Sequence, residues 1–170
     1  MKRYKSQNII LLENVIFFLK DKLIVGGRMK VVDLKVKDNN GDIVSMEKLK
    51  LEKLEGVLEE KASRGKNKQV SILSVEIRSH IDTGSINGLC TGRFYENITV
   101  SGLDASELSI GSKIEVGDTI LEVTEVGKRC FNDCELVKED RYCQLSDGAI
   151  FTRVLKEGKV RMNSNVKVIR

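Results

Sequence analysis

One stretch decides the fold class of this chain, Ser112-Lys-Ile-Glu-Val-Gly-Asp-Thr-Ile-Leu-Glu-Val-Thr-Glu-Val126. Apolar and polar side chains largely alternate over residues 112–116 and again over residues 119–126, and this period of two is typical of half-buried β-strands. The short Gly117-Asp118 pair between the two runs indicates a tight turn. We therefore predict a β-hairpin, with one face of each strand turned toward a core.

Similar strand signals recur along the chain, whereas helical signals are few. Asn39-Asn-Gly41 is a turn signal between Val36 and Ile43. Helical spacing of apolar residues is convincing only in Met46–Leu58, and it is weaker in Leu73–Ser79 and Ala105–Leu108. Further strands are predicted at Ile150–Leu155, around Val160 and at Val166–Ile169. Many short strands with few helices predict a mainly β protein and are typical of a β-barrel.

The length and composition predict one domain and argue against nucleic acid as a partner. The 170 residues suffice for a single well-supported core. Lysine and arginine total 29 against 25 for aspartate and glutamate, and the charges are interspersed along the chain. A net charge of +4 is too mild to imply nucleic-acid binding, and 5% aromatic residues without tryptophan leave few rings for base stacking.

The first residues contain apolar runs that superficially imitate an export signal. Ile9-Ile-Leu-Leu12 and Val15-Ile-Phe-Phe-Leu19 are separated by Glu13 and Asn14, and no small-residue cleavage site follows. Both runs are far shorter than the ~20 residues that span a bilayer. We therefore expect no membrane association and a cytoplasmic location, in which thiols stay reduced.

Cys130 is the candidate reactive residue. It follows Lys128 and Arg129, and neighbouring cations favour the thiolate, which is the reactive form of cysteine. The predicted strand 120–126 leads to it through Gly127, so we expect Cys130 at a strand end that faces a cleft. The alternative is a cysteine that serves as a small buried hydrophobe.

Five segments between Val31 and the C-terminus resemble the MOSC domain, which is named for the C-terminal domain of molybdenum cofactor sulfurase. The segments occur in the order of the family, and the likeness is greatest to its small stand-alone bacterial members. They are Gln69-Val-Ser-Ile-Leu-Ser74; Gly92-Arg-Phe-Tyr-Glu-Asn-Ile98 leading to Gly102-Leu-Asp104; Leu108-Ser-Ile-Gly111 with Ile120-Leu-Glu-Val-Thr124; Gly127-Lys-Arg-Cys130 with Cys134 and Cys143; and Gly148-Ala-Ile-Phe-Thr-Arg-Val-Leu155.

The resemblance implies a particular architecture. Residues 29–170 are expected to form a closed, mixed β-barrel of the pyruvate-kinase insert type with a few short peripheral helices. Residues 1–28 are then an N-terminal extension, either a tail or a short amphipathic helix. The helix is suggested by apolar residues at helical spacing, namely Ile9, Leu12, Ile16 and Leu19.

The resemblance also implies a role in molybdenum cofactor metabolism. The family cysteine that corresponds to Cys130 carries sulfur as a persulfide for transfer to molybdenum, or it binds the pterin cofactor directly, so Cys130 is a possible molybdenum ligand. A cysteine desulfurase or another sulfur donor and a molybdoenzyme acceptor are the partners expected. Two other hypotheses are a small molybdoenzyme that reduces N-hydroxylated compounds, and a non-catalytic cofactor-binding or anion-binding module whose cysteines are structural.

Six residues are candidates for contacts with molybdopterin. Glu96 and Asn97 match the acidic-amide pair of the family, and an Asn amide can both donate to and accept from a pterin edge. Alternatively, Asn97 forms a turn beside an exposed Glu96. The four cations are Arg93 and Arg153, which are suited to bidentate contacts with the phosphate, and Lys128 and Arg129, which precede the cysteine.

The other three cysteines leave several alternatives open. Cys134 or Cys143 can be an auxiliary thiol that resolves a persulfide on Cys130 or protects it from over-oxidation. Three or four thiolates, with Cys90 among them, could instead bind zinc, although the spacing departs from paired C-x2-C knuckles. We favour plain packing for Cys90 and Cys143.

The chain also departs from the family pattern. Family members often have Gly-Asp-x-His where this chain has Glu59-Glu-Lys-Ala62, and the residue after the cysteine is Phe131 where histidine is frequent. Arg129 replaces a proline that other members carry. The single histidine, His80, lies outside all five segments, so catalysis by a histidine base is poorly supported.

Overall fold

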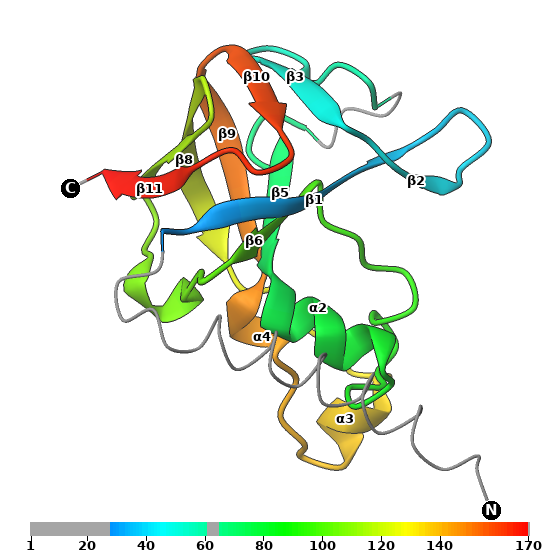
Figure 1. Cartoon of the computed structure of the whole chain (residues 1–170). Coiled ribbons are helices and arrows are strands. Elements are labelled where there is room, and N and C mark those ends of the chain that lie inside the picture. The colour runs from blue at the N-terminus through cyan, green and yellow to red at the C-terminus, as the bar shows by residue number, and fades with distance from the viewer. Residues whose placement is uncertain (1–27, 61–64, 170) are drawn as a thin grey trace, which may run out of the picture.

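A computed structural model describes residues 28–60 and 65–169, which form two β-sheets with short helices at one end (Figure 1). The strands are β1 (Lys30–Lys37), β2 (Ile43–Ser45), β3 (Lys48–Glu52), β4 (Gly56–Val57), β5 (Val70–Ser74), β6 (Ile98–Ser101), β7 (Lys113–Val116), β8 (Thr119–Val126), β9 (Ile150–Lys156), β10 (Gly158–Arg161) and β11 (Val166–Ile169). The helices are α2 (Val75–Asp82), the 3-10 turn η1 (Ala105–Glu107), α3 (Glu135–Lys138) and α4 (Leu145–Gly148). The prediction of a mainly β protein with few short helices is confirmed.

The larger sheet is mixed and has eight strands in the order β11-β7-β8-β9-β5-β6-β1-β2. Only β5 and β6 run parallel to each other, while the other neighbouring strands are antiparallel. The predicted hairpin is confirmed, because β7 and β8 pair from Val116 with Thr119 to Lys113 with Glu122. The predicted turn at residues 39–41 joins β1 to β2.

The larger sheet does not close into the predicted barrel. The start of β1 and the segment that leads into β11 meet at one isolated bridge, between Lys30 and Asn165, instead of in a continuous ladder. The physical reason lies in β1, whose outer edge pairs with β2 over Lys35–Lys37 and is left for the C-terminal segment only near its start. The backbone N–H of Val31 donates to the carbonyl of Ser164 (3.0 Å) at this point.

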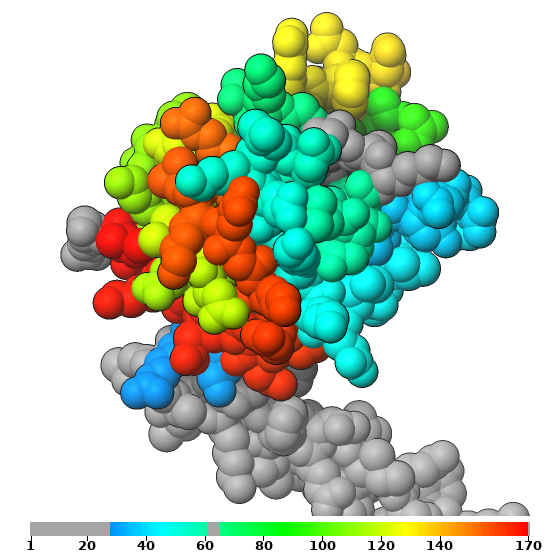
Figure 2. Space-filling model, turned by 90° about the horizontal axis from the view of Figure 1, so that it is seen from above, coloured from blue at the N-terminus to red at the C-terminus, as the bar shows by residue number. Residues whose placement is uncertain are grey.

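The smaller sheet corrects the helical prediction for residues 46–58. This segment forms β3 and β4, and the order of the sheet is β10-β3-β4. Leu49 and Leu51 are buried while Lys48 and Lys50 are exposed, so the period is two and not 3.6. In Figure 2, β3 and β10 lie side by side on one face, as their pairing requires.

Both sheets contribute to one apolar core. Leu34 of β1, Ile72 of β5 and Leu121 of β8 come from the larger sheet, and Leu49 and Leu51 come from the smaller one. Each of these five side chains is at most 1% exposed. The smaller sheet therefore covers part of the inner face of the larger sheet.

The helices gather at one end of the larger sheet (Figure 1). Helix α2 begins directly after β5, and α4 ends just before β9 begins. Since β5 and β9 are antiparallel neighbours, the end of one strand and the start of the other lie at the same edge. Ser74 caps α2, because its hydroxyl accepts a hydrogen bond from the backbone N–H of Ile77 (3.3 Å).

Two expectations concern the N-terminal part of the chain and the membrane. The residues for which an amphipathic helix is predicted (Ile9, Leu12, Ile16 and Leu19) lie outside the described residues. Within residues 28–60 and 65–169, no helix has the length and apolar character needed to cross a membrane.

Gly127 ends β8 and directs the chain toward Lys128 and Cys130. Its φ is +85°, which is a left-handed conformation that glycine adopts readily. A Cβ at this position would lie 1.9 Å from the carbonyl oxygen of Ser146, so the two backbone segments approach as closely as they do only because Gly127 has no side chain. Its backbone N–H also donates to the carbonyl of Ala149 (2.7 Å).

We expect Gly127→Ala to lower the free energy of unfolding by about 3 kcal/mol, because steric overlap adds to the strain of a positive φ. Gly111→Ala is the matched control, since Gly111 also has a positive φ (+91°) but has no atom within 4 Å of an added Cβ. The control should lose only about 1 kcal/mol. Urea unfolding of the three proteins measures the difference, and equal losses for both variants would contradict this account of Gly127.

Candidate functional site

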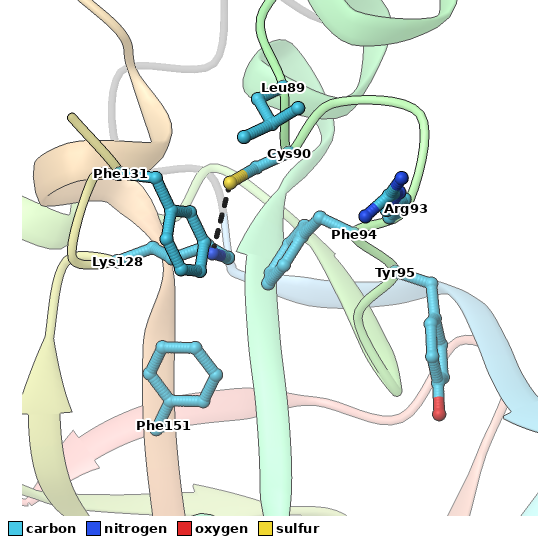
Figure 3. A pocket seen from close by; sticks show the side chains of 8 residues that line it. All are labelled: Leu89, Cys90, Arg93, Phe94, Tyr95, Lys128, Phe131 and Phe151. Atoms are coloured by element: carbon cyan, nitrogen blue, oxygen red, sulfur yellow. Dashed lines mark hydrogen bonds between the residues drawn. The ribbon is translucent and has the colours of Figure 1, made fainter. Parts of the chain in front are cut away.

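The main cavity of the helical end has a volume of about 410 Å³ and is open to the surface. Four aromatic rings line it, those of Phe94, Tyr95, Phe131 and Phe151. The rings of Phe94 and Phe151 meet edge to face, with centroids 6.4 Å apart (Figure 3). A cavity of this size with aromatic walls is suited to a planar organic ligand.

The loop that carries Cys90 forms one wall of this pocket. The hydroxyl of Thr91 donates to the carbonyl of Gly88 (2.8 Å) and accepts from the N–H of the same residue (3.1 Å). The backbone N–H groups of Arg93 and Phe94 both donate to the carbonyl of Cys90, at 3.0 and 2.8 Å. These local bonds coil the chain tightly around Cys90 and hold its side chain on the pocket wall.

Cys90 meets Lys128 in the pocket. The ammonium nitrogen Nζ of Lys128 lies 3.1 Å from Sγ of Cys90, and both side chains are half-buried (Figure 3). The same ammonium group lies 5.0 Å from the ring centroid of Phe131. An anionic sulfur on Cys90 would therefore be paired with a cation that is already in place.

Cys130 lines a second, smaller cavity beside the main pocket. Its thiol is half-buried and free, and its nearest hydrogen-bond acceptor is the carbonyl of Lys128, at 3.9 Å. The small cavity has about 10 Å³ for water, which is room for one molecule at most. Cys130 thus follows a strand end as predicted, but the cavity that it faces is the small one.

All four cysteines line this small cavity, and all four are free. The backbone N–H of Leu89, 3.4 Å from Sγ of Cys134, lowers the pKa of that thiol, and backbone N–H groups of α3 act in the same direction. Burial raises the pKa of the Cys143 thiol, and the other three cysteines add to the rise. The predicted grouping of Cys130, Cys134 and Cys143 is therefore present, and Cys90 joins it.

The zinc alternative requires three or four ligands that converge on one point. The described part of the chain contains no set of three or more Cys, His, Asp or Glu side chains placed to hold a metal ion. His80 lies elsewhere on the surface, where its Nδ1 contacts Oε1 of Gln144 (2.8 Å).

Glu96 is placed inside the protein and does not line either cavity. Its carboxylate is fully buried, and it accepts hydrogen bonds from Lys35 Nζ (3.0 Å), Arg78 Nε (3.1 Å) and the hydroxyl of Thr99 (2.6 Å). Burial opposes the charge, but the hydrogen bonds from Arg78 and Thr99 and the charges of Arg78 and Lys35 outweigh it, so the pKa of Glu96 lies below its ordinary value. Its observed role is to join β1, α2 and β6.

Asn97 is also fully buried and fully engaged with protein groups. Its Oδ1 accepts from the backbone N–H (3.0 Å) and the hydroxyl (3.1 Å) of Ser71, and its Nδ2 donates to the carbonyl of Lys35 (3.2 Å) and to Glu60 (2.9 Å). The hydroxyl of Tyr95 donates to the same Glu60 carboxylate. Glu96 and Asn97 therefore do not form an exposed turn, and they do not lie on the pocket wall.

The four predicted cations separate into three groups. Lys128 and Arg93 line the main pocket, although Arg93 is exposed, and Lys128 also lines the small cavity. Arg129 is exposed and lines the small cavity. Arg153 lies on β9 and forms an ion pair with Glu122 of β8, so it contributes to neither cavity.

Cys90 is the functional candidate that the sequence interpretation missed. It was assigned to packing, and it does contact the apolar cluster around Leu73 and Phe151, but its sulfur also faces the pocket and Lys128. The available signal was its position two residues before Gly92, at the start of the best-defined motif segment. Nothing in the sequence placed it beside a lysine that lies 38 positions later.

Comparisons with known proteins identify a family and similar structures for this chain. A family model of the MOSC domain matches residues 59–167. The YUAD protein from Bacillus subtilis has a similar structure, with a TM-score of 0.60, 21% identity, and coverage of 84% of this chain and 96% of that one. YiiM from Geobacillus stearothermophilus gives a TM-score of 0.54 and 18% identity, covering 84% of this chain and 75% of that one.

YiiM from Escherichia coli gives a TM-score of 0.55 and 13% identity, with coverage of 83% of this chain and 70% of that one. No curated protein matches the chain. At these identities the structural likeness concerns the fold, whereas the roles of individual residues rest on the geometry described above.

We expect Glu96→Gln to lower the free energy of unfolding at neutral pH by about 3 kcal/mol, because Arg78 and Lys35, only 12% and 17% exposed, lose their buried anion. Because folding lowers the pKa of Glu96, its stabilising contribution is present above the ordinary value of 4.5 and is lost as pH falls through the folded-state pKa. Urea unfolding across this range should show the difference between wild type and variant shrinking in acid.

Glu122→Gln is the control for this experiment. Glu122 also pairs with an arginine, but Arg153 is 50% exposed, so the loss should be about 1 kcal/mol or less. A difference between wild type and Glu96→Gln that stays constant down to strongly acidic pH would show that the charge of Glu96 is not what stabilises the fold.

Proposed function

Because this chain belongs to the MOSC domain family, we propose that it handles the molybdenum cofactor, with the pterin bound in the main pocket and sulfur carried as a persulfide on Cys130 for transfer to molybdenum. One observation carries the proposal. Free thiols from separate parts of the chain converge beside an open aromatic pocket that also holds two cations.

The residues of the pocket fit a pterin that carries a phosphate. The volume of about 410 Å³ is within the range of small-molecule sites, and the rings of Phe94, Phe131 and Phe151 offer faces and edges for a planar heterocycle. Arg93 and Lys128 supply positive charge for the phosphate from two different segments. When bound, the cofactor would supply a molybdenum centre able to take sulfur as a ligand.

The remaining residues act on the shape of the site. Glu96 and Asn97 hold the segment that follows the pocket wall, through Arg78, Lys35 and Ser71. In this proposal they position the Cys90–Tyr95 loop and do not touch the pterin. Arg153 has no part in binding, because its charge is paired with Glu122.

The half-buried position of Cys130 suits a sulfur carrier. Its thiol is free, as a thiol must be to take up sulfur, and its partial burial limits contact of a persulfide with oxidants. Exposed Arg129 and Phe131 flank it and offer a surface for a sulfur donor of the cysteine desulfurase type. A molybdoenzyme would be the acceptor, and the cytoplasm is the compartment in which such exchange between thiols is expected.

The binding half of the proposal predicts which charges matter. Arg93→Ala and Lys128→Met should each weaken binding of the pterin molybdenum cofactor, released from a denatured molybdoenzyme, by about tenfold, since each removes a charge-assisted contact of about 1.5 kcal/mol. Quenching of pterin fluorescence measures the affinity. Arg161→Ala, which removes an exposed arginine paired with Asp118, should leave it unchanged. Equal affinity in all four proteins would place the ligand elsewhere.

The carrier half of the proposal predicts a covalent adduct. Protein produced in cells with an active cysteine desulfurase should carry one added sulfur atom on Cys130, removable by a thiol reductant and absent from Cys130→Ser, because only a free thiol can hold sulfane sulfur. Intact mass spectrometry before and after reduction checks this. Molybdenum retained in equal amount with unmodified protein would favour the small molybdoenzyme, and neither adduct nor cofactor would favour a module with structural cysteines.

A further inference from the structure

Cys90 is the thiol that connects the two cavities. All four cysteines line the small cavity, but among them only Cys90 also lines the main pocket. Cys130 therefore faces a space that admits one water molecule at most, whereas the ligand-sized space opens on Cys90. Among the four cysteines, Cys90 is therefore the one through which sulfur taken up at Cys130 can reach the main pocket.

We propose that Cys90 is a second sulfur-carrying residue, which receives sulfane sulfur from Cys130 across the small cavity and presents it in the main pocket beside Lys128. The proposal rests on the proposed function, because it needs Cys130 to be loaded first. It adds a residue that lies outside the five segments of the sequence resemblance, and an order of events for the two thiols.

The transfer step balances without an oxidant or a reductant. The thiolate of Cys90 attacks the outer sulfur of the Cys130 persulfide, a new S–S bond forms on Cys90, and the S–S bond on Cys130 breaks. The electron pair of the broken bond stays on Cys130 as a thiolate, and the transferred sulfur keeps its proton. One thiolate and one persulfide are consumed, and one of each is formed.

Lys128 gives this transfer a direction. Its Nζ lies 3.1 Å from Sγ of Cys90, while its backbone N–H donates to the carbonyl of Leu145 (2.7 Å) and so anchors the residue to α4. A fixed ammonium group stabilises the attacking thiolate before transfer, and it stabilises the ionised persulfide on Cys90 once the proton of the outer sulfur has passed to the thiolate left on Cys130. Sulfur that reaches Cys90 is thus held where the cation lies.

Cys134 and Cys143 are less suited to this role. Cys134 is 6% exposed, and its sulfur accepts a hydrogen bond from the backbone N–H of Leu89. Cys143 packs against two apolar clusters, those around Leu73 and Ile86. Neither thiol lines the main pocket, so sulfur moved to either would not reach the ligand-sized space.

The test loads the reduced full-length protein with a cysteine desulfurase and a limiting amount of cysteine, because a protein donor is too large to enter the main pocket, and quenches samples over time with an alkylating reagent. Peptide mass spectrometry, with fragmentation that separates Cys130 from Cys134, locates the added sulfur. In the wild type it should appear first on Cys130 and later on Cys90. In Cys90→Ser it should stay on Cys130, and in Cys130→Ser the labelling of Cys90 should fall at least tenfold.

Lys128 variants test the second step separately. Lys128→Met should slow the passage of sulfur from Cys130 to Cys90 at least tenfold, measured as the rate at which sulfur leaves already loaded Cys130 and appears on Cys90, and Lys128→Arg should restore most of that rate. Lys68→Met is the matched control, because the ammonium of Lys68 also lies over a pocket ring, 4.5 Å from the centroid of Phe151, but pairs with Glu125 and not with a sulfur. It should behave as the wild type.

The outcomes separate the relay from the function on which it rests. No sulfur on Cys130 in the wild type would overturn the proposed carrier function, and the relay with it. Sulfur on Cys130 that never reaches Cys90, or that reaches Cys134 or Cys143 instead, would overturn the relay alone. Rapid labelling of Cys90 in Cys130→Ser would also overturn the relay alone. Urea unfolding midpoints equal to that of the wild type would confirm that the variants are folded.

Discussion

The buried carboxylate of Glu96 is the constraint on which the functional end of this protein depends. Side chains from β1, α2 and β6 converge on it, and it has no exposed surface. A charge buried in this way is tolerated only when its partners are in place, so the three elements must dock together. Since Glu96 follows directly on the loop that carries Cys90 and Phe94, the same docking sets the position of one pocket wall.

The opposite wall depends on a different device, the absence of a side chain at Gly127. This residue lets the end of β8 pass within contact of the segment before β9, and the backbone N–H of Lys128 then bonds to Leu145. One wall is thus held by a buried ion cluster and the other by close backbone packing. The Cys90–Lys128 contact lies where the two walls meet, and the proposed chemistry of the site depends on it.

Glu96 and Asn97 belong to the family motif next to the pocket, but they do not form part of the pocket surface. The pair was interpreted as a ligand-binding element, but every polar group described for it is bonded to protein. Cys90, by contrast, was assigned to packing, and yet it lines the pocket. Both differences have one origin, because the direction of a side chain in a loop follows from tertiary contacts and not from the spacing of residues.

The sequence by itself determined the β character of the chain, the β7–β8 hairpin, the strand-end position of Cys130 and the family, because alternation, turn residues and segment order are local properties. Residues 46–58 contain both helical spacing and, over residues 48–52, the alternation of a strand, and only the tertiary structure decided between the two, since the partner of β3 is β10, far along the chain. It also decided that the sheet stays open and that Lys128 faces Cys90. These outcomes depend on contacts between remote segments, which no local pattern encodes.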